Sequence, residues 1–163
     1  MKTYRSKTGN YLLEAARWRK PGDSDRVGEG WSSGESCGLL PAPKNLTLTR
    51  GLRYHPAMIN TATGRAVEVG SGDWICHNKT LDVWYSMTDA MFRVLMDDPA
   101  YTTMRAHQYL YHVIGSPVMA DHEFDRFCRM HDLDGSGGSD RASDYKHEEV
   151  IEAGLILHKK KAG

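Results

Sequence analysis

The segment from residue 105 to residue 126 constrains the fold most, because it predicts two helices with a fixed break between them. The first helix is expected over residues 99–114. Gly115-Ser116-Pro117 ends it, because proline cannot donate an amide hydrogen bond and disfavours helix in the residue before it. The first helix carries an unusual density of rings with hydrogen-bonding atoms, namely His107, Tyr109, Tyr111 and His112.

The second helix of this hairpin is expected to begin at Asp121. Its carboxylate is placed to act as the N-cap, accepting hydrogen bonds from the free amides of the next turn. The apolar residues that follow have the i, i+3, i+4 spacing of one buried face, namely Phe124, Phe127 and Cys128.

Residues 1–98 alternate polar and apolar side chains over short runs, which is typical of strands. The opening residues 2–18 are expected to be extended, and one short helix is expected over residues 90–96. The glycine- and serine-rich stretch between Pro21 and Glu35 is expected to be a loop or a mobile insertion. Further strands are expected at residues 37–40, 46–52, 57–60, 65–69, 74–77 and 82–87.

Residues 131–140 begin like a calcium-binding loop, with Asp132 and Asp134 placed to offer alternating oxygens to a hard cation. The likeness then fails, because Ser143 stands where a bidentate glutamate is required. We therefore predict a flexible linker and no metal site.

The last helix is expected over residues 145–160, with Ser143 or Asp144 as its cap and lysines at its C-terminal end, where the helix dipole favours them. The predicted fold class is therefore α+β. Residues 1–98 would form a small, mainly-β unit with one short helix. Residues 99–163 would form the helical hairpin and the C-terminal helix.

The charge balance argues against nucleic acid as the main partner. The 163-residue chain has 21 lysines and arginines and 21 aspartates and glutamates, whereas nucleic-acid binders usually carry a basic excess. No apolar run could cross a bilayer and no signal pattern is present, so a cytosolic protein without a membrane partner is expected. The three widely spaced cysteines predict free thiols.

The helical hairpin resembles the N-terminal module, domain Ia, of bacterial NAD-dependent DNA ligases. The matching residues are His107-Gln-Tyr109-Leu-Tyr111-His112-Val113, then Pro117, then Asp121-His-Glu123-Phe124-Asp125-Arg126-Phe127. In that family the module closes over the nicotinamide mononucleotide (NMN) half of NAD. Matched residue by residue, the resemblance implies nicotinamide contacts for Tyr111, His112, Asp121, Phe124 and Asp125. Phe124 replaces the tyrosine that is usual in the family, so its ring can stack but offers no hydroxyl.

These residue types suit a pyridine nucleotide, whose nicotinamide is a flat cation with a carboxamide. Tyr111 and Phe124 can offer ring faces, and cation–π attraction contributes about 0.5–2 kcal/mol. Asp121 and Asp125 lie four residues apart, on one side of the helix, and offer acceptors. His112 can donate to ribose or phosphate oxygens. A purely structural interpretation makes Asp121 only a cap; for the neighbouring residues Tyr109, Phe127 and Cys128 we favour packing.

The ligase reaction itself is not expected, because it requires a lysine in a Lys-x-Asp-Gly motif, which the chain lacks. We assign no catalytic residues. The first hypothesis is a non-catalytic protein that binds NAD, NMN or an NAD-derived signal. One alternative is a protein-interaction module that docks on a host nucleotidyltransferase or ligase. A second is a small hydrolase of NAD metabolites with acid or base residues in the same pocket.

Residues 1–97 are similar to a group of small phage proteins. The shared features are Tyr4-Arg5-Ser-Lys7, Glu14-Ala15-Ala-Arg-Trp18, Gly72-Asp73-Trp74-Ile75 and Thr88-Asp89-Ala-Met-Phe92. The similarity implies a phage origin and the cytoplasm of an infected bacterium, without implying an activity. Combined with the ligase resemblance, it suggests that nucleotide capture counters a host defence.

Overall fold

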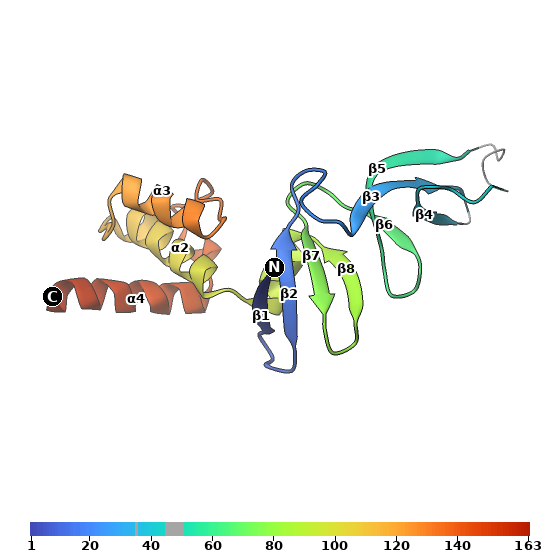
Figure 1. Ribbon diagram of the computed structural model, residues 1–163. Coiled ribbons are helices and arrows are strands. Elements are labelled where there is room, and N and C mark those ends of the chain that lie inside the picture. The colour runs from blue at the N-terminus through green and yellow to red at the C-terminus, as the bar shows by residue number, and fades with distance from the viewer. Residues whose placement is uncertain (35, 45–50) are drawn as a thin grey trace. The chain divides into compact units, whose positions relative to one another are not determined.

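The computed structural model describes residues 1–34, 36–44 and 51–163, and it is a mixed α+β structure (Figure 1). The chain divides into two compact units, Met1–Asp97 and Asp98–Gly163, called here the β unit and the helical unit. The strand expected over residues 46–52 falls largely outside the described residues.

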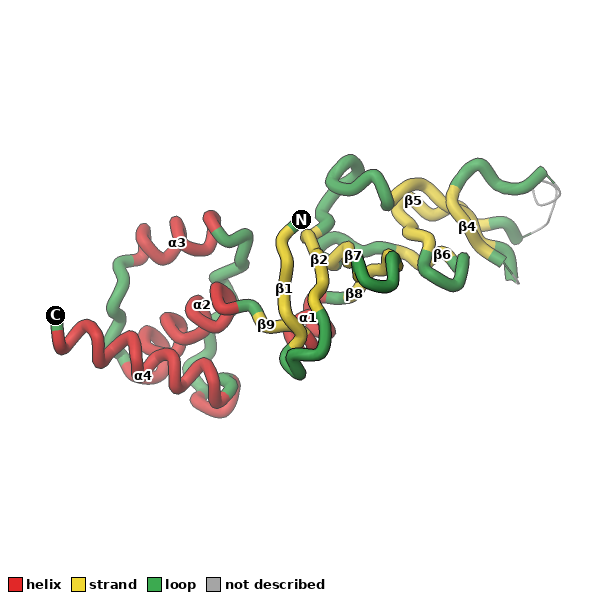
Figure 2. Tube along the Cα trace, turned by 60° about the horizontal axis from the view of Figure 1, so that its bottom comes forward, coloured by secondary structure: helices red, strands yellow, loops and turns green. Residues whose placement is uncertain are grey.

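The β unit contains two antiparallel sheets, with strand orders β8-β7-β2-β1-β9 and β4-β3-β5-β6 (Figures 1 and 2). One helix, α1, covers Asp89–Leu95 and is capped by the Thr88 hydroxyl, which accepts from the amide of Met91. The strands are β1 Lys2–Ser6, β2 Leu12–Arg17, β3 Val27–Ser32, β4 Cys37–Leu39, β5 Arg53–Asn60, β6 Ala66–Glu68, β7 Trp74–Asn78, β8 Val83–Met87 and β9 Met96–Asp97.

Both faces of strand β7 are buried, because successive residues of a strand point to opposite sides of the sheet. On one side Trp74 stacks on Phe92 of α1, with ring centroids 3.8 Å apart and planes 7° from parallel. On the other side Ile75 packs in a cluster with Ala57 and Ile59 of β5. The start of β7 therefore packs on α1 on one side and on β5 of the second sheet on the other.

Strand β3 corrects one prediction, since it lies in the glycine-rich stretch expected to be a loop. Glycine and serine favour turns in sequence, but here a long-range contact requires glycine. A Cβ on Gly30 would lie 2.3 Å from the sulfur of Met58 on the neighbouring strand. The next residue, Trp31, is buried and donates from its indole nitrogen to the carbonyl of Leu39.

The helical unit contains α2 Pro99–Tyr109, a π-helical turn at Leu110–Ile114, α3 Asp121–Met130, a short 3₁₀ turn at Ala142–Asp144 and α4 His147–Ala162. Both views place α2 between α3 and α4 (Figures 1 and 2). Its core is small: Ala106 and Leu110 pack against Ala153 of α4. Gly115, with φ of +70°, ends the π-helical turn in the left-handed conformation that favours glycine.

Two predicted helix caps were wrong, for one physical reason. Helix α3 begins at Asp121, its N-cap is Ala120, and the Glu123 carboxylate accepts from the Ala120 amide at 3.0 Å. The last helix begins at His147, and Glu149 likewise accepts from the amide of Lys146 at 2.9 Å. In each helix a glutamate of the first turn satisfies a backbone amide. Ser143 and Asp144 instead lie in the 3₁₀ turn.

Candidate functional site

A small pocket of about 120 Å³ lies entirely within the helical unit. The C-terminal part of α2, the π-helical turn, the connection to α3 and the loop after α3 all contribute to it. Its lining residues are His107, Gln108, Tyr111, His112, Pro117, Val118, Met119, Asp121, Phe124 and Gly135. The pocket thus brings together four of the five residues that the ligase resemblance implies. Asp125, the fifth, is not among the lining residues.

The π-helical turn sets the positions of Tyr111 and His112. A π-turn accommodates an extra residue relative to an α-turn, and such turns are frequent at functional sites. The two rings meet edge-on, with centroids 4.8 Å apart. Tyr111 is 53 % exposed, so about half of its surface is open to solvent.

Helix α3 supplies the opposite wall. Asp121 is exposed in the first turn, where a carboxylate also interacts favourably with the helix dipole. Phe124, one turn further on, is half-buried. Asp125 is exposed and lies close enough to Cys128 for its charge to add to the effect of burial in raising the pKa of that thiol.

The loop after α3 was predicted as a flexible linker but packs closely on the pocket. A Cβ on Gly135 would lie 2.7 Å from the Phe124 ring and 2.8 Å from the Cys128 sulfur. A Cβ on Gly138 would lie 2.2 Å from Nε2 of His112. The loop is rich in glycine because its backbone approaches these side chains directly. Within the described residues no group of three or more His, Cys, Asp or Glu side chains could hold a metal ion.

Gln108 is a pocket residue that was not predicted. It is 3 % exposed, and its Nε2 donates to the carbonyl of Gly135 at 2.8 Å. Its Oε1 accepts from Nη1 of Arg105 at 3.0 Å. A polar side chain on the buried side of α2 was the only sign of it in the sequence. Its hydrogen-bond partner could not be recognised, because Gly135 lies 27 residues away.

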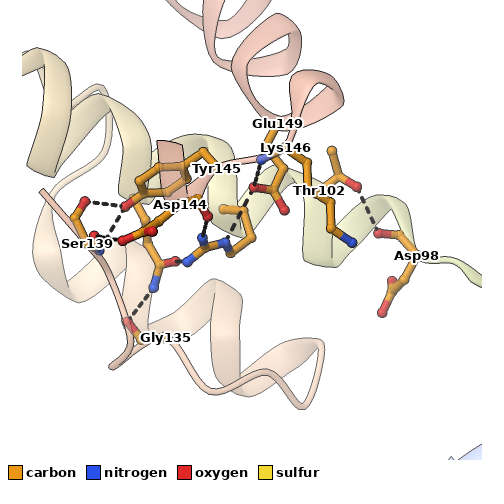
Figure 3. A network of polar contacts seen from close by, with 10 residues as sticks. Asp98, Thr102, Gly135, Ser139, Asp144, Tyr145, Lys146 and Glu149 are labelled. Carbon is orange, nitrogen blue, oxygen red and sulfur yellow. Dashed lines mark hydrogen bonds and ion pairs between the residues drawn. The ribbon is translucent and has the colours of Figure 1, made fainter. Parts of the chain in front are cut away.

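Arg105 ties the loop and α4 to α2, and Figure 3 labels its partners Asp144, Tyr145 and Glu149. Its Nη2 donates to the carbonyl of Asp144 at 2.8 Å, and its Nε lies 3.5 Å from the carboxylate of Glu149. The guanidinium also lies over the ring of Tyr145, 4.3 Å from the centroid. Tyr145 in turn exchanges hydrogen bonds with the backbone of Ser139. This network holds the loop that carries Gly135 against the pocket.

The lining residues include one carboxylate, Asp121, and two histidines, His107 and His112. Burial lowers the pKa of His107, and the nearby charge of Glu152 opposes this only in part. At neutral pH the imidazole of His107 is therefore uncharged and would not repel a cation. Asp121 adds a carboxylate to the rim.

The packing residues expected beside the pocket are accounted for in the helical unit. Tyr109 contacts Tyr145 edge-on, with centroids 5.3 Å apart, and packs against the Ala106 cluster. Phe127 contacts the ring of His131, and Cys128 is a buried free thiol. No described helix combines the length and apolar character needed to cross a membrane.

No protein-family model, curated protein or solved structure matches this chain. The interpretation of the pocket therefore depends on its own residues and geometry.

Proposed function

We propose that the helical unit binds a pyridine nucleotide without converting it, with the nicotinamide ring in the small pocket. The observation that carries the proposal is the convergence of Tyr111, His112, Asp121 and Phe124 on one cavity. These residues supply two aromatic rings, a carboxylate and a ring donor, which are the groups that a cationic, carboxamide-bearing ring requires.

The size of the pocket decides which part of the nucleotide enters it. An enclosed cavity of about 150 Å³ accepts a benzene ring, whereas pockets for whole drug-sized ligands have about 300–1,000 Å³. The pocket of about 120 Å³ is smaller than both, so no more than one ring could enter it. Ribose and phosphate would remain outside, within reach of the exposed side chain of His112. NMN is the smallest ligand that offers all these groups.

The positive charge of the ring provides the sharpest test of the proposal. Calorimetric titration of the full chain should detect binding of NMN and NAD, whose rings are cationic, and weaker binding of reduced NMN, whose ring is neutral. Equal affinity for oxidised and reduced NMN would contradict the role of the aspartate and the rings. An absence of heat with NMN, NAD and cyclic ADP-ribose would overturn the proposal.

Two aspartates one helical turn apart offer a matched pair of variants. Asp121→Asn removes the carboxylate at the rim and should weaken NMN binding at least fivefold, or about 1 kcal/mol. Asp125→Asn removes the same charge from a position outside the lining and should change the affinity less. Tyr111→Ala should also cost at least about fivefold through lost stacking. If the two aspartate variants lowered the NMN affinity equally, the nicotinamide ring would have to bind elsewhere on α3.

Binding without turnover would suit a phage protein that captures an NAD-derived signal and so blunts a host defence. Incubation with NAD or NMN followed by product analysis should return the nucleotide unchanged. Appearance of free nicotinamide or of a hydrolysed phosphate would instead support the hydrolase alternative. Capture of a nucleotidyltransferase from bacterial lysate, with no affinity for NMN, would support the docking alternative.

A further inference from the structure

The four-stranded sheet of the β unit carries a second pocket, which is open and has a volume of about 760 Å³. Its described lining comes from the end of β3, the start of β4, strand β5 and the turn into β6. The volume lies within the range of about 300–1,000 Å³ that is usual for small-molecule sites. Three of its side chains, Ser32, His55 and Glu68, are joined by polar contacts.

A β-bulge places these three side chains on one face of the sheet. Gly28 pairs with Met58 and Gly30 pairs with His55, so two residues of β5 lie opposite one residue of β3. In a regular strand His55 and Met58, three residues apart, would point to opposite faces, because side chains alternate; the bulge places them on the same face. One of the two residues inside the bulge is Pro56, which cannot donate a ladder hydrogen bond.

The rest of the register completes the arrangement. Ser32 lies two residues beyond Gly30 and so shares its face, and Glu68 pairs directly with Met58. The serine, the histidine and the glutamate thus come from three neighbouring strands and lie side by side. Gly30 leaves the space that the side chain of Met58 occupies.

The contacts have the order of a nucleophile, a base and an orienting acid. The distance from Oγ of Ser32 to Nε2 of His55 is 2.7 Å, and Nδ1 of His55 contacts the carboxylate of Glu68. With Nδ1 donating to the carboxylate, Nε2 carries the lone pair that accepts the serine proton. The side chain of His55 is only 13 % exposed, so its ring is held by the sheet.

We infer that this pocket is a second, separate site, an acyl-hydrolase centre with Ser32 as nucleophile and His55 as general base. Oγ of Ser32 would bond to the carbonyl carbon of an ester while its proton passes to Nε2. The C–O bond to the alcohol then breaks, and the alcohol leaves with that proton. A water molecule, deprotonated by His55, then attacks the acyl carbon; the bond to Oγ of Ser32 breaks, the carboxylic acid is released, and His55 returns the proton to Oγ. Glu68 orients the imidazole and stabilises its charged form.

The lining indicates the class of ester. Ser36 and Thr63 line the pocket beside the apolar Val67, which suits a short acyl group rather than a long apolar chain. Arg65 is the one lysine or arginine among the described lining residues. Its guanidinium is therefore the cationic donor available to the carbonyl oxygen that becomes negative during attack.

Labelling of the full chain with a serine-reactive fluorophosphonate, followed by peptide mapping, tests the nucleophile directly. One adduct is expected, on Ser32. Ser32→Ala should abolish it, and His55→Gln should slow it at least 100-fold. Ser71→Ala is the control, because Ser71 belongs to the same unit but does not line the pocket, and its hydroxyl donates to the carbonyl of Arg19. This variant should be labelled at the wild-type rate.

The wild-type chain alone can overturn the inference. An absence of label on Ser32, or equal labelling of Ser32 and Ser33, would show that the hydroxyl is not activated and that the three contacts are only structural. The result is independent of the proposed nucleotide site, because NMN titration of Ser32→Ala should give the wild-type affinity.

Glu68 is tested as a positioning residue by steady-state hydrolysis of p-nitrophenyl acetate. Its side chain is 67 % exposed, so solvent screens its charge more than that of a buried acid. Glu68→Gln should therefore lower kcat about tenfold, less than the loss of about 10⁴ seen when a buried triad aspartate is replaced, and leave KM unchanged. An unchanged kcat would remove Glu68 from the site, and a change in KM alone would assign it to substrate binding.

Discussion

At the scale of single residues, the wall of the small pocket includes a buried amide side chain whose oxygen and nitrogen both have hydrogen-bond partners. Gln108 is almost fully buried, yet Arg105 and Gly135 satisfy its two ends. A buried amide without partners would cost about 1–3 kcal/mol. The aromatic and acidic residues that face the cavity could be proposed from the sequence, because their types match a ligand. Gln108 could not, because its role depends on a loop that is distant in sequence.

His107 should make the stability of the protein sensitive to acid. Because burial lowers the pKa of His107, protonating it costs the folded state more than the unfolded one. This cost should be absent well above the unfolded pKa of about 6.5, should grow as the pH falls from there toward the lower folded pKa, and should level off below it. The free energy of unfolding in urea should therefore fall between about pH 7.5 and about pH 5. His107→Gln should reduce that fall.

His122→Gln provides the control for this measurement, since His122 also belongs to the helical unit but is exposed on α3. It should retain the wild-type dependence on pH. If His107→Gln kept the full dependence as well, burial of His107 would not be its cause.

Gly135 should tolerate no side chain. Alanine would place its Cβ under 3 Å from the ring of Phe124 and from the sulfur of Cys128, both on α3. Overpacking of this kind costs about 1–3 kcal/mol, which urea unfolding would measure. Gly137→Ala is the control, since no described heavy atom lies within 4 Å of its Cβ. Equal stability of the two variants would mean that the loop shifts freely.

At the scale of elements, the sequence predicted most helices and strands but missed those that depend on long-range contacts. The alternation of polar and apolar residues indicated β5 to β8, and the break at Pro117 indicated the hairpin. Strand β3 was missed because glycine and serine indicate loops locally, while Met58, which explains Gly30, lies in another strand. The His55–Glu68 contact was missed for a similar reason, since a bulge brings these two side chains to one face.

The geometry of the Arg105 guanidinium, and not only its charge, should stabilise the packing of α4 and of the loop after α3 on α2. Lysine at this position would keep the charge. Its single, compact ammonium nitrogen would not reproduce the planar fork in which Nη1 donates to Gln108 and Nη2 to the carbonyl of Asp144. Arg105→Lys should lower the free energy of unfolding by about 1–3 kcal/mol. It should also speed amide exchange in the loop that carries Gly135. Arg129→Lys, an exposed change on α3, should do neither, and matching values for the two variants would contradict the network.

At the scale of the whole molecule, the two pockets belong to different compact units. The residues of the small pocket all lie beyond Asp98, and those of the large pocket all precede Asp97. The change from strand-like alternation to helical spacing can be recognised in the sequence. The chemistry of the large pocket cannot, because its three contacting residues are spread over 36 positions and meet only through the register of the sheet.

This separation predicts where NMN changes the dynamics of the chain. A ligand that binds only the folded helical unit stabilises that unit by mass action, and local opening there becomes rarer. Hydrogen exchange of the full chain with saturating NMN should therefore slow within residues 98–163, most of all around the π-helical turn and the loop at Gly135. Exchange in the β unit should be unchanged, and Asp121→Asn at the same NMN concentration should reduce the protection. Protection that extended into β1 or β7 would instead require that the β unit contributes to the nucleotide site, which the lining of the small pocket does not include.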